Sequence, residues 1–520
     1  MVIVSITPEI ALEEINCYAG GLGVLEGDKF IEASKNGFEY LVLTLFHKKG
    51  YVDYYVTDDG NIIAKPQKQP IDLTKFMKAE EEFVIKIRGE NVYTRPWTYT
   101  KGRAKVVFFE ATCPLWLRQA TERVYIEKDE ESRIYKWTFL AKASAKYIKE
   151  FIGLDSVDVI DLNEAYASLL VYALPEYKNF RLIVHTPGPW GHPYISSQVL
   201  EEEFGIRIKH DSEMITRLAL ERVSKACAVS KKHYEVTKIL FPEFVHKFSY
   251  VTNGVSIDRW RHPIIRGLVA GKGIENISSE ELWRTHLEVK KELIEDLLKI
   301  YKPGLEIDET TPIVVWCRRI VRYKRPYFIT WFIEDIGRDL DAVFVIGGKP
   351  HPDDRDGLHY AKKFLELSKK YDNIVFIHDY DISKAKLLLS GCDIHLFTPF
   401  PGWEACGTSY MKAALNGIPT LSSRDGGALE LIVDGLNGWF FGSEINEFIN
   451  IYSDTRVNDI DKVEYEEFRE KLVDVLKSYG SIKYKEVALN ALKSSERFSI
   501  KRVLSELYTP IKENNSSVSG

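Results

Sequence analysis

Short runs of apolar residues recur along the chain, and polar or helical stretches separate them. In the first half these runs, each expected to form a strand, cover residues 1–6, 39–46, 157–162, 180–185, 226–229 and 248–252. In the second half they cover residues 313–316, 342–346, 374–377, 394–397 and 419–421. Short apolar runs that alternate with helical patterns indicate βαβ units and parallel sheets. The two separate series therefore predict an α/β chain with two doubly wound, Rossmann-like domains.

Changes in composition along the chain predict where these domains begin and end. We expect, in order, an N-terminal domain at 1–262 with an aromatic, β-rich insert at about 50–110, a charged helical connector at 263–309, a C-terminal domain at 310–485, a helix at 486–511 that packs back across the hinge, and a disordered tail at 512–520. Sheets of this type bind ligands at the carboxyl ends of their strands. We therefore expect the functional site in a cleft between the two domains.

Composition narrows the class of protein. The chain has 70 Lys and Arg against 76 Asp and Glu, and this near balance indicates neither a nucleic-acid partner nor a membrane-surface role. Its six cysteines are scattered, which is typical of reduced thiols rather than of disulfides or a zinc site. We find no metal-ligand cluster, no signal peptide and no apolar run of roughly 18 residues. We expect a soluble cytoplasmic protein, and the scarcity of glutamine with abundant charge suggests a thermophile.

The stretch 400–430 combines a carboxylate, a lysine and two glycine turns that lead into helices. Such loop-to-helix transitions offer backbone N–H groups to an anion. Glu404 is suited to bind sugar hydroxyls or to stabilise positive charge at an anomeric carbon, although a glutamate also serves at a helix start. Lys412 is suited to pair with phosphate or to form a Schiff base, and the alternative is an exposed helical lysine. The residues alone leave these alternatives open.

A basic cluster directly follows the strand at 313–316. It consists of Arg318, Arg319, Arg322, Lys324 and Arg325. So many cations at the end of a buried strand are costly unless they face an anion or water. A phosphate or pyrophosphate is the partner that this position favours over a merely solvated basic face.

Two further motifs in the first half follow predicted strands. Gly20, Gly21 and Gly23 form a glycine-rich loop, which permits close approach to an anion but also suits a tight turn. His185 opens a rigid, proline-rich segment, where it is suited to bind a sugar hydroxyl or to remain a core histidine.

Taken in order along the chain, these segments resemble the α-glucan (glycogen and maltodextrin) phosphorylases, especially the shorter prokaryotic type. The similar segments lie between about residues 15 and 440: YAGGLGVLEGD from Tyr18, LNE from Leu162, HTPGPWGH from His185, TNGV from Thr252 with Trp260, RR…YKR from Arg318, and EACGTSYMKAALNG from Glu404. Six ordered segments are far more specific than any single motif.

The resemblance implies a fold, a reaction and roles for particular residues. The fold is the GT-B arrangement, in which two Rossmann-like domains face a cleft. The reaction is retaining transfer of a terminal α-1,4-glucosyl unit of glycogen or maltodextrin to inorganic phosphate, which gives glucose 1-phosphate, and the family includes homodimers. Arg319 and Lys324 would hold the substrate phosphate with the amides of Gly20 and Gly21. The glucose would be held by His185, Asn163, Glu404, Ala405, Cys406 and Gly407.

The resemblance also implies a cofactor, pyridoxal 5'-phosphate, held as a Schiff base on Lys412. Thr408 and Arg318 would contact this cofactor, whose phosphate assists catalysis. The sequence departs from the family at two positions near these motifs, because Tyr410 replaces a usual glycine and Tyr166 replaces a usual histidine.

Two other functions remain open from the sequence. The run 419–439 resembles nucleotide-sugar transferases and glycogen synthases, in which Arg319 and Lys324 would grip the diphosphate of UDP- or ADP-glucose and no pyridoxal phosphate would be present. The third function is that of a catalytically silent glycogen-binding protein that uses the aromatic insert at 51–99. The retained basic cluster, which is suited to bind phosphate, argues against a catalytically silent protein, because glucan binding alone does not need such a cluster.

Overall fold

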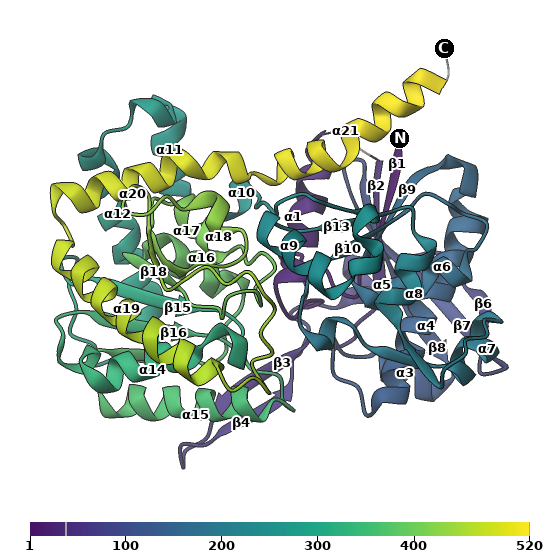
Figure 1. Cartoon of the computed structure of the whole chain (residues 1–520), viewed down its shortest axis with the longest axis horizontal. Coiled ribbons are helices and arrows are strands. Elements are labelled where there is room, and N and C mark those ends of the chain that lie inside the picture. The colour runs from purple at the N-terminus through teal and green to yellow at the C-terminus, as the bar shows by residue number, and fades with distance from the viewer. Residues whose placement is uncertain (37–38, 519–520) are drawn as a thin grey trace. The chain divides into compact units, whose positions relative to one another are not determined.

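The computed structural model describes residues 1–36 and 39–518, and its helices and mainly parallel strands form two compact units (Figure 1). Unit 1 comprises Met1–Tyr51, Pro66–Ser256 and the C-terminal segment from Ile500. Unit 2 comprises Val52–Lys65 and Ile257–Ser499. The mixed α/β class with parallel sheets that the sequence predicts is thereby confirmed. Among the described helices, we find none that is both long enough and apolar enough to cross a membrane.

The sheet of unit 1 is parallel over most of its width. Its strands lie in the order β14-β13-β10-β9-β1-β2-β8-β7-β5, with β6 also paired to β7. The parallel strands are β1 (Val2–Ile6), β2 (Glu39–Leu45), β8 (Ala104–Cys113), β9 (Val157–Asn163), β10 (Phe180–Val184), β13 (Lys225–Ala228) and β14 (Phe248–Tyr250). The insert adds the antiparallel strands β5 (Lys78–Ala79), β6 (Phe83–Ile87) and β7 (Glu90–Lys101). The strand order reverses beside β1, which makes the β1/β9 pair a topological switch point.

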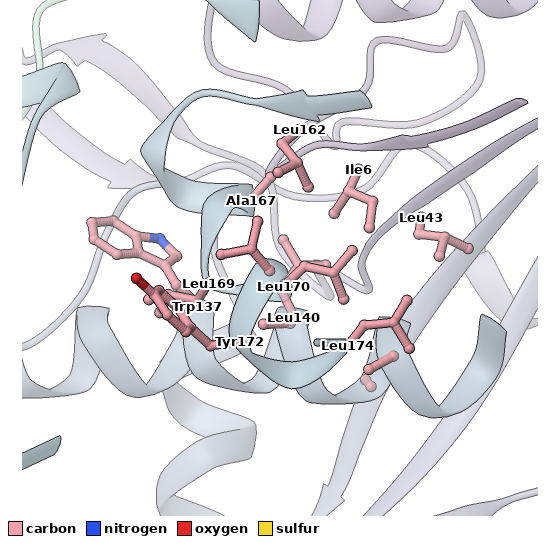
Figure 2. Packing of buried hydrophobic residues seen from close by; sticks show 14 of the residues in the cluster. Ile6, Leu43, Trp137, Leu140, Leu162, Ala167, Leu169, Leu170, Tyr172 and Leu174 are labelled. Carbon is pink, nitrogen blue, oxygen red and sulfur yellow. The ribbon is translucent and has the colours of Figure 1, made fainter. Parts of the chain in front are cut away.

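Helices cover this sheet and complete its core. Figure 2 shows Leu140 of α4 and Leu170 of α6 packed with Ile6 and Leu162, which come from β1 and β9. Each such side chain contributes about 1.5–3 kcal/mol when it is fully buried. The helices of unit 1 include α1 (Gly21–Asn36), α3 (Leu115–Thr121), α4 (Glu130–Tyr147), α5 (Ala165–Ser168), α6 (Leu170–Ala173), α7 (Ser197–Phe204), α8 (Ile215–Arg222), α9 (Lys231–Leu240) and α21 (Ile500–Val518).

The main sheet of unit 2 is wholly parallel, with the order β17-β16-β15-β18-β19-β20. Its strands are β15 (Ile313–Cys317), β16 (Val343–Gly347), β17 (Ile374–Ile377), β18 (Ile394–Phe397), β19 (Thr420–Ser423) and β20 (Trp439–Phe441). Every residue of these strands is buried, which explains why they appear in the sequence as continuous apolar runs. The strand order reverses between β15 and β18, so this pair is the switch point of unit 2.

The helices of unit 2 include the predicted connector. They are α10 (Ile257–Trp260), α11 (Pro263–Lys272), α12 (Ser279–Leu293), α13 (Lys299–Tyr301), α14 (Pro326–Asp335), α15 (Arg355–Lys370), α16 (Ile382–Gly391), α17 (Ser409–Ala414), α18 (Ala428–Leu431), α19 (Val457–Ser478) and α20 (Ile482–Ser495). Lys290 and His286 of α12 bind the buried carboxylate of Asp393 at 2.7 and 2.8 Å. This ion cluster joins the connector to the start of β18.

The structure differs from the sequence prediction at three places. Helix α1 begins at Gly21, within the glycine-rich segment that was expected to be a loop. The hairpin β3 (Val52–Val56) and β4 (Ile62–Pro66) groups with unit 2, where Asp53 binds Lys349 at 2.9 Å. Helix α21, yellow in Figure 1, extends to Val518, although 512–520 was expected to be disordered; residues 519–520 lie outside the described part.

Candidate active site

Three of the predicted site residues meet at the switch point of unit 2. Arg318 directly follows β15, Lys324 lies in the next turn, and Glu404 follows β18. Glu404 Oε2 lies 2.5 Å from Arg318 Nη2 and 3.4 Å from Lys324 Nζ. The side chains come together because β15 and β18 are parallel neighbours whose carboxyl ends share one edge of the sheet.

Buried hydrogen bonds fix the loop that carries Lys324. Trp316 Nε1 donates to Thr398 Oγ1 at 2.9 Å, and that hydroxyl donates to the carbonyl of Lys324 at 2.8 Å. The N–H of Phe400 donates to the carbonyl of Tyr323 at 2.7 Å. The segments that follow β15 and β18 are therefore joined to each other by hydrogen bonds.

A buried carboxylate holds the loop of Glu404. Asp425 accepts hydrogen bonds from the N–H groups of Gly402 and Glu404, both at 2.8 Å. Gly426 has a positive φ of 56°, and a Cβ there would lie 2.6 Å from the carbonyl of Glu404. Burial raises the pKa of Asp425 to about 7 despite these bonds. The synthase-like run around Asp425 thus supports the Glu404 backbone.

The charges in this group are unbalanced in favour of cations. Arg318 is only 6% exposed, lies 4.2 Å from the centre of the Phe397 ring, and within the described chain its Nε and Nη1 have no hydrogen-bond partner. Burial and then Arg318 lower the pKa of Lys324 to about 7. Burial disfavours ionised Glu404, but Lys324 and Arg318 outweigh burial and hold its pKa below the usual value. Buried N–H groups without partners at a cationic site indicate a place for an anion.

The other predicted residues of this loop lie close by. Arg319 is half-buried and, after the larger effects of Lys324 and Arg318, contributes to the lowered pKa of Glu404. Ala405 is buried, as is Cys406, whose Sγ lies 3.6 Å from the hydroxyl of Tyr410. Gly407 leaves no room for a side chain, because a Cβ would lie 2.8 Å from the Phe397 ring and 3.2 Å from Glu404 Oε1.

Lys412 lies in α17, in the interior of unit 2. It is 7% exposed, its N–H donates to the carbonyl of Thr408 at 3.1 Å, and its Nζ lies 3.9 Å from the centre of the Trp260 ring. Asn416 fixes this arrangement by donating to the carbonyls of both Lys412 and Trp260, at 2.9 and 3.0 Å. The interpretation of Lys412 as an exposed helical lysine is therefore wrong.

The tyrosine that departs from the family pattern is accommodated in the core. Tyr410 is fully buried, and its ring meets Phe397 edge to face at 4.9 Å. Burial raises the pKa of the Cys317 thiol, and the charges of Arg318 and Lys412 both act against this rise, so the two cations lie near the same side chain. A buried lysine amine near the unpartnered N–H groups of Arg318 fits a group that carries both an aldehyde and a phosphate. The residues present therefore fit pyridoxal phosphate.

Two of the predicted residues of unit 1, Asn163 and His185, meet at the β1/β9 switch point. His185 Nε2 lies 3.0 Å from Asn163 Oδ1, and Asn163 Nδ2 donates to Ser5 Oγ and to the carbonyl of Ile6 at 3.0 and 3.1 Å. Burial and then the charge of Lys29 lower the pKa of His185 well below its usual value, so the imidazole is neutral near pH 7. This group offers neutral hydrogen-bonding atoms.

Sequence reasoning assigned no role to Glu164. This residue follows β9 with a φ of 68°, which is rare for a residue other than glycine, and it is 3% exposed. Its Oε1 accepts the N–H of His185 at 2.7 Å, and burial raises its pKa to about 8. The sequence holds two signals, a carboxylate placed directly after a buried strand and its place in the LNE segment that resembles the family. Strain of this kind is often found at functional sites.

An internal carboxylate already engages the glycine segment. Glu9, 2% exposed, accepts the N–H groups of Ala19 and Gly20 at 2.5 and 3.2 Å, and Gly21 begins α1. Within the described part of the chain, and apart from adjoining residues and the backbone of the same helix, no atom lies within 4 Å of a Cβ built on Gly20 or Gly21. The Gly20 amide, which was expected to help bind phosphate, thus donates to Glu9 in this structure.

The predicted site residues therefore fall into two groups, one in each unit. Unit 1 contains Gly20, Gly21, Asn163 and His185, and unit 2 contains Arg318, Arg319, Lys324, Glu404, Ala405, Cys406, Gly407, Thr408 and Lys412.

Comparisons with known proteins agree on one family. A family model described as carbohydrate phosphorylase matches residues 209–500, which is more than half of the chain. The chain is 29% identical to a maltodextrin phosphorylase of Thermococcus litoralis, over 82% of this chain and 60% of the relative, and 29% identical to a glycogen phosphorylase of Aquifex aeolicus, over 85% and 76%. A glycogen phosphorylase of Mycobacterium bovis is 25% identical, over 85% and 62%. The chain thus spans less than two thirds of the length of the first and third of these relatives.

Proposed function

The chain belongs to the carbohydrate phosphorylase family, and on that premise we propose that it is an α-glucan phosphorylase. It transfers terminal α-1,4-glucosyl units of glycogen or maltodextrin to inorganic phosphate and releases glucose 1-phosphate. The observation that carries the proposal is the buried Arg318–Lys324–Glu404 group, in which two N–H groups of Arg318 have no partner in the described chain. Phosphorolysis requires such a site for a phosphate beside a sugar.

The two groups of residues have different roles in this reaction. Arg319 and Lys324 hold the substrate phosphate, and Glu404 binds sugar hydroxyls next to it. His185 and Asn163 supply the neutral hydrogen-bonding atoms that orient the terminal glucose, as do the backbone amides of Ala405, Cys406 and Gly407. We propose that both groups act on one substrate, in the GT-B arrangement of two Rossmann-like domains facing a cleft. The family resemblance further suggests a homodimer.

Lys412 would hold pyridoxal phosphate through its Nζ, and Thr408 and Arg318 would contact the cofactor's phosphate. When bound, the cofactor would supply a phosphate group that assists catalysis. Lys412 lies in the interior, where Trp260 and Asn416 limit its freedom, so its amine is positioned before the cofactor arrives. The relatives are named phosphorylases, so a synthase that uses UDP- or ADP-glucose is not favoured.

The decisive experiment combines turnover with cofactor detection. The purified chain is incubated with maltoheptaose and phosphate, and glucose 1-phosphate is quantified, with UDP-glucose and ADP-glucose as alternative donors. Absorbance, and mass spectrometry after borohydride reduction, report a pyridoxyl adduct, which we expect on Lys412 and not in Lys412→Ala. A colourless protein that turns over only nucleotide sugars would overturn the proposal. A protein inactive with every donor would favour the silent glycogen-binding function.

A further inference from the structure

One cation of the basic cluster has no role in the proposed reaction. Arg325 is fully buried, and its Nε lies 2.8 Å from Asp461 Oδ1, while its Nη1 lies 2.5 Å from Glu464 Oε2. The guanidinium also lies 4.8 and 4.6 Å from the ring centres of Phe328 and Phe400. The anions that Arg325 faces are therefore side chains of α19, and its guanidinium is not a contact for a substrate.

Arg325 adjoins Lys324 in a strained stretch of backbone. Its φ is 51°, in the left-handed region that residues other than glycine rarely adopt. Its N–H donates to the carbonyl of Arg322 at 2.9 Å and so closes the short turn η7 (Arg322–Lys324), and α14 begins at the next residue. Strained backbone persists only where the surroundings hold it. Here the buried contacts of the Arg325 side chain hold it, so they also fix the turn that carries Lys324.

The same side chain contacts the segment that leads to Glu404. Phe400, whose ring lies against the guanidinium, donates its N–H to the carbonyl of Tyr323 at 2.7 Å. Arg325 therefore packs against both segments whose spacing sets the distance of 3.4 Å between Lys324 Nζ and Glu404 Oε2. A shift of the Arg325 side chain would move these two charged groups relative to each other.

Helix α19 provides a fixed point for Arg325. Asp461 and Glu464 lie three residues apart and so on one face of this helix. Asp461 Oδ2 accepts the hydroxyl of Tyr327 at 2.7 Å, and Glu464 Oε1 accepts the N–H of Ser443 at 3.2 Å. Each carboxylate thus has a second contact, and its position does not depend on the arginine alone.

We propose that Arg325 is a positioning residue for the phosphate site: its ion pairs with Asp461 and Glu464 hold the turn of Lys324 where the ammonium binds the substrate phosphate. The inference rests on the proposed function, because it concerns the lysine that the proposal assigns to phosphate. Arg325 itself does not contact the substrate. The substitution Arg325→Lys would not preserve this role, because a compact ammonium lacks the planar fork that pairs with two carboxylates between two rings.

The first test compares kinetic constants, with pyridoxal phosphate added throughout. Arg325→Lys keeps the charge but loses the fork, and a displacement of about 1 Å at a reacting site lowers the rate by about 10²-fold. We expect kcat/KM for phosphate to fall by about that factor, KM for phosphate to rise, and KM for maltoheptaose to stay at the wild-type value. An equal rise in both KM values would overturn the inference.

Glu464→Gln is a milder variant, which serves also if Arg325→Lys does not fold. It keeps the shape of the side chain and an oxygen for the N–H of Ser443, but it removes the charge that pairs with Arg325. We expect the same changes by a smaller factor. Phosphate kinetics like those of the wild type in Glu464→Gln would count against the inference.

Lys290→Gln is the matched control for a general loss of stability. Lys290 is fully buried in unit 2 and lies 2.7 Å from Asp393 Oδ2, so this variant also breaks an ion pair between buried groups. We expect the temperature of unfolding to fall in both variants and KM for phosphate to rise only in Arg325→Lys. A rise in Lys290→Gln as large as that in Arg325→Lys would mean that a loosened unit 2 explains the effect, against the inference.

The second test follows Lys324 without any need for activity. Burial and then Arg318 lower the pKa of Lys324 to about 7, and Glu404 and Arg319 also face this amine. Acetylation by trace acetic anhydride across a range of pH, followed by mass spectrometry, measures the pKa of the Lys324 amine. We expect a value near 7 in the wild type and a higher value in Arg325→Lys, because a displaced amine is more exposed to water. An unchanged pKa in Arg325→Lys would overturn the inference.

These outcomes separate the two proposals. A wild type that forms no glucose 1-phosphate rejects the proposed function, and the acetylation of Lys324 still tests whether Arg325 holds its turn. An active wild type, in which Arg325→Lys and Glu464→Gln change neither the KM for phosphate nor the pKa of Lys324, rejects only the positioning role of Arg325.

Discussion

The two groups of candidate residues differ in electrical character. In unit 2, Arg318 and Lys324 bring more positive charge to a buried place than Glu404 neutralises. In unit 1, His185 is neutral near pH 7, and its partner is the amide of Asn163. Buried charge is costly without a partner, whereas neutral donors and acceptors need only hydrogen bonds. The difference is consistent with the proposal that unit 2 binds an anion and that unit 1 binds the hydroxyls of a sugar.

The two groups share one means of support. In each unit a buried carboxylate accepts the backbone N–H of a predicted substrate residue: Glu164 accepts that of His185 at 2.7 Å, and Asp425 accepts that of Glu404 at 2.8 Å. Burial raises the pKa of both carboxyls, to about 8 and about 7. The supports are therefore alike, and the difference between the units lies in the side chains that they hold in place.

The largest expected effect tests this shared support through the pH dependence of stability. A carboxyl with a raised pKa binds its proton more tightly in the folded state, so its contribution is complete below about pH 4 and is lost as the pH rises through 7 or 8. Asp425→Asn and Glu164→Gln should each remove up to about 4 kcal/mol of the fall in unfolding free energy between pH 4 and pH 9. Urea unfolding followed by tryptophan fluorescence measures this slope.

The control is Asp454→Asn, because that half-buried carboxyl has a pKa lowered to about 2, mainly by Arg456, and does not titrate in this range. We expect its slope to equal that of the wild type. If only one of Asp425→Asn and Glu164→Gln weakened the dependence of the unfolding free energy on pH, the two buried carboxyls would not support their units in the same way.

The next effect concerns the charged group alone. Lys324→Ala removes one cation of the proposed phosphate site, and loss of one preorganised donor typically lowers kcat by about 10²–10³-fold. We expect the KM for phosphate to rise at the same time and the KM for maltodextrin to change little. Initial rates at varied phosphate and fixed maltoheptaose measure both quantities.

Lys363→Ala is the matched control, since Lys363 pairs with Glu334 on the surface of unit 2. Its kinetics should follow the wild type. If Lys324→Ala instead raised only the KM for maltodextrin, the assignment of the anion to unit 2 would be incorrect.

The sequence predicts those features of the fold and of the candidate site that depend on the order of neighbouring residues in the chain. The strands of unit 2 are buried on both faces, so they appear as uninterrupted apolar runs. Arg318 and Lys324 stand out because cations rarely follow such a strand without an anion to face. Position relative to a buried strand was therefore enough to suggest a phosphate site.

The parts that the sequence misses depend on contacts between distant residues. Glu9 binds the N–H groups of Ala19 and Gly20, and helix α1 begins at the next residue, where the glycines suggested a loop. Glu164 is identified by its backbone strain and its bond to His185, neither of which leaves a pattern in the sequence. Tyr410 is compatible with the site because Phe397, thirteen residues earlier, packs against its ring.

The smallest expected effect concerns the neutral group. His185→Ala removes one uncharged hydrogen bond, which is worth about 0.5–1.5 kcal/mol. The loss rises to about 3 kcal/mol if the side chain of Asn163 is left buried without a partner. We therefore expect kcat/KM for maltodextrin to fall about ten- to a hundredfold. His185→Asn retains a donor and an acceptor and should recover part of the loss. Because burial and Lys29 keep His185 neutral, neither variant should alter the pH profile of kcat/KM between pH 6 and 8. If His185→Ala abolished the acidic limb of the pH profile of kcat/KM, or raised the KM for phosphate, unit 1 would contribute charge to the reaction. The contrast between a charged group in unit 2 and a neutral group in unit 1 would then not hold.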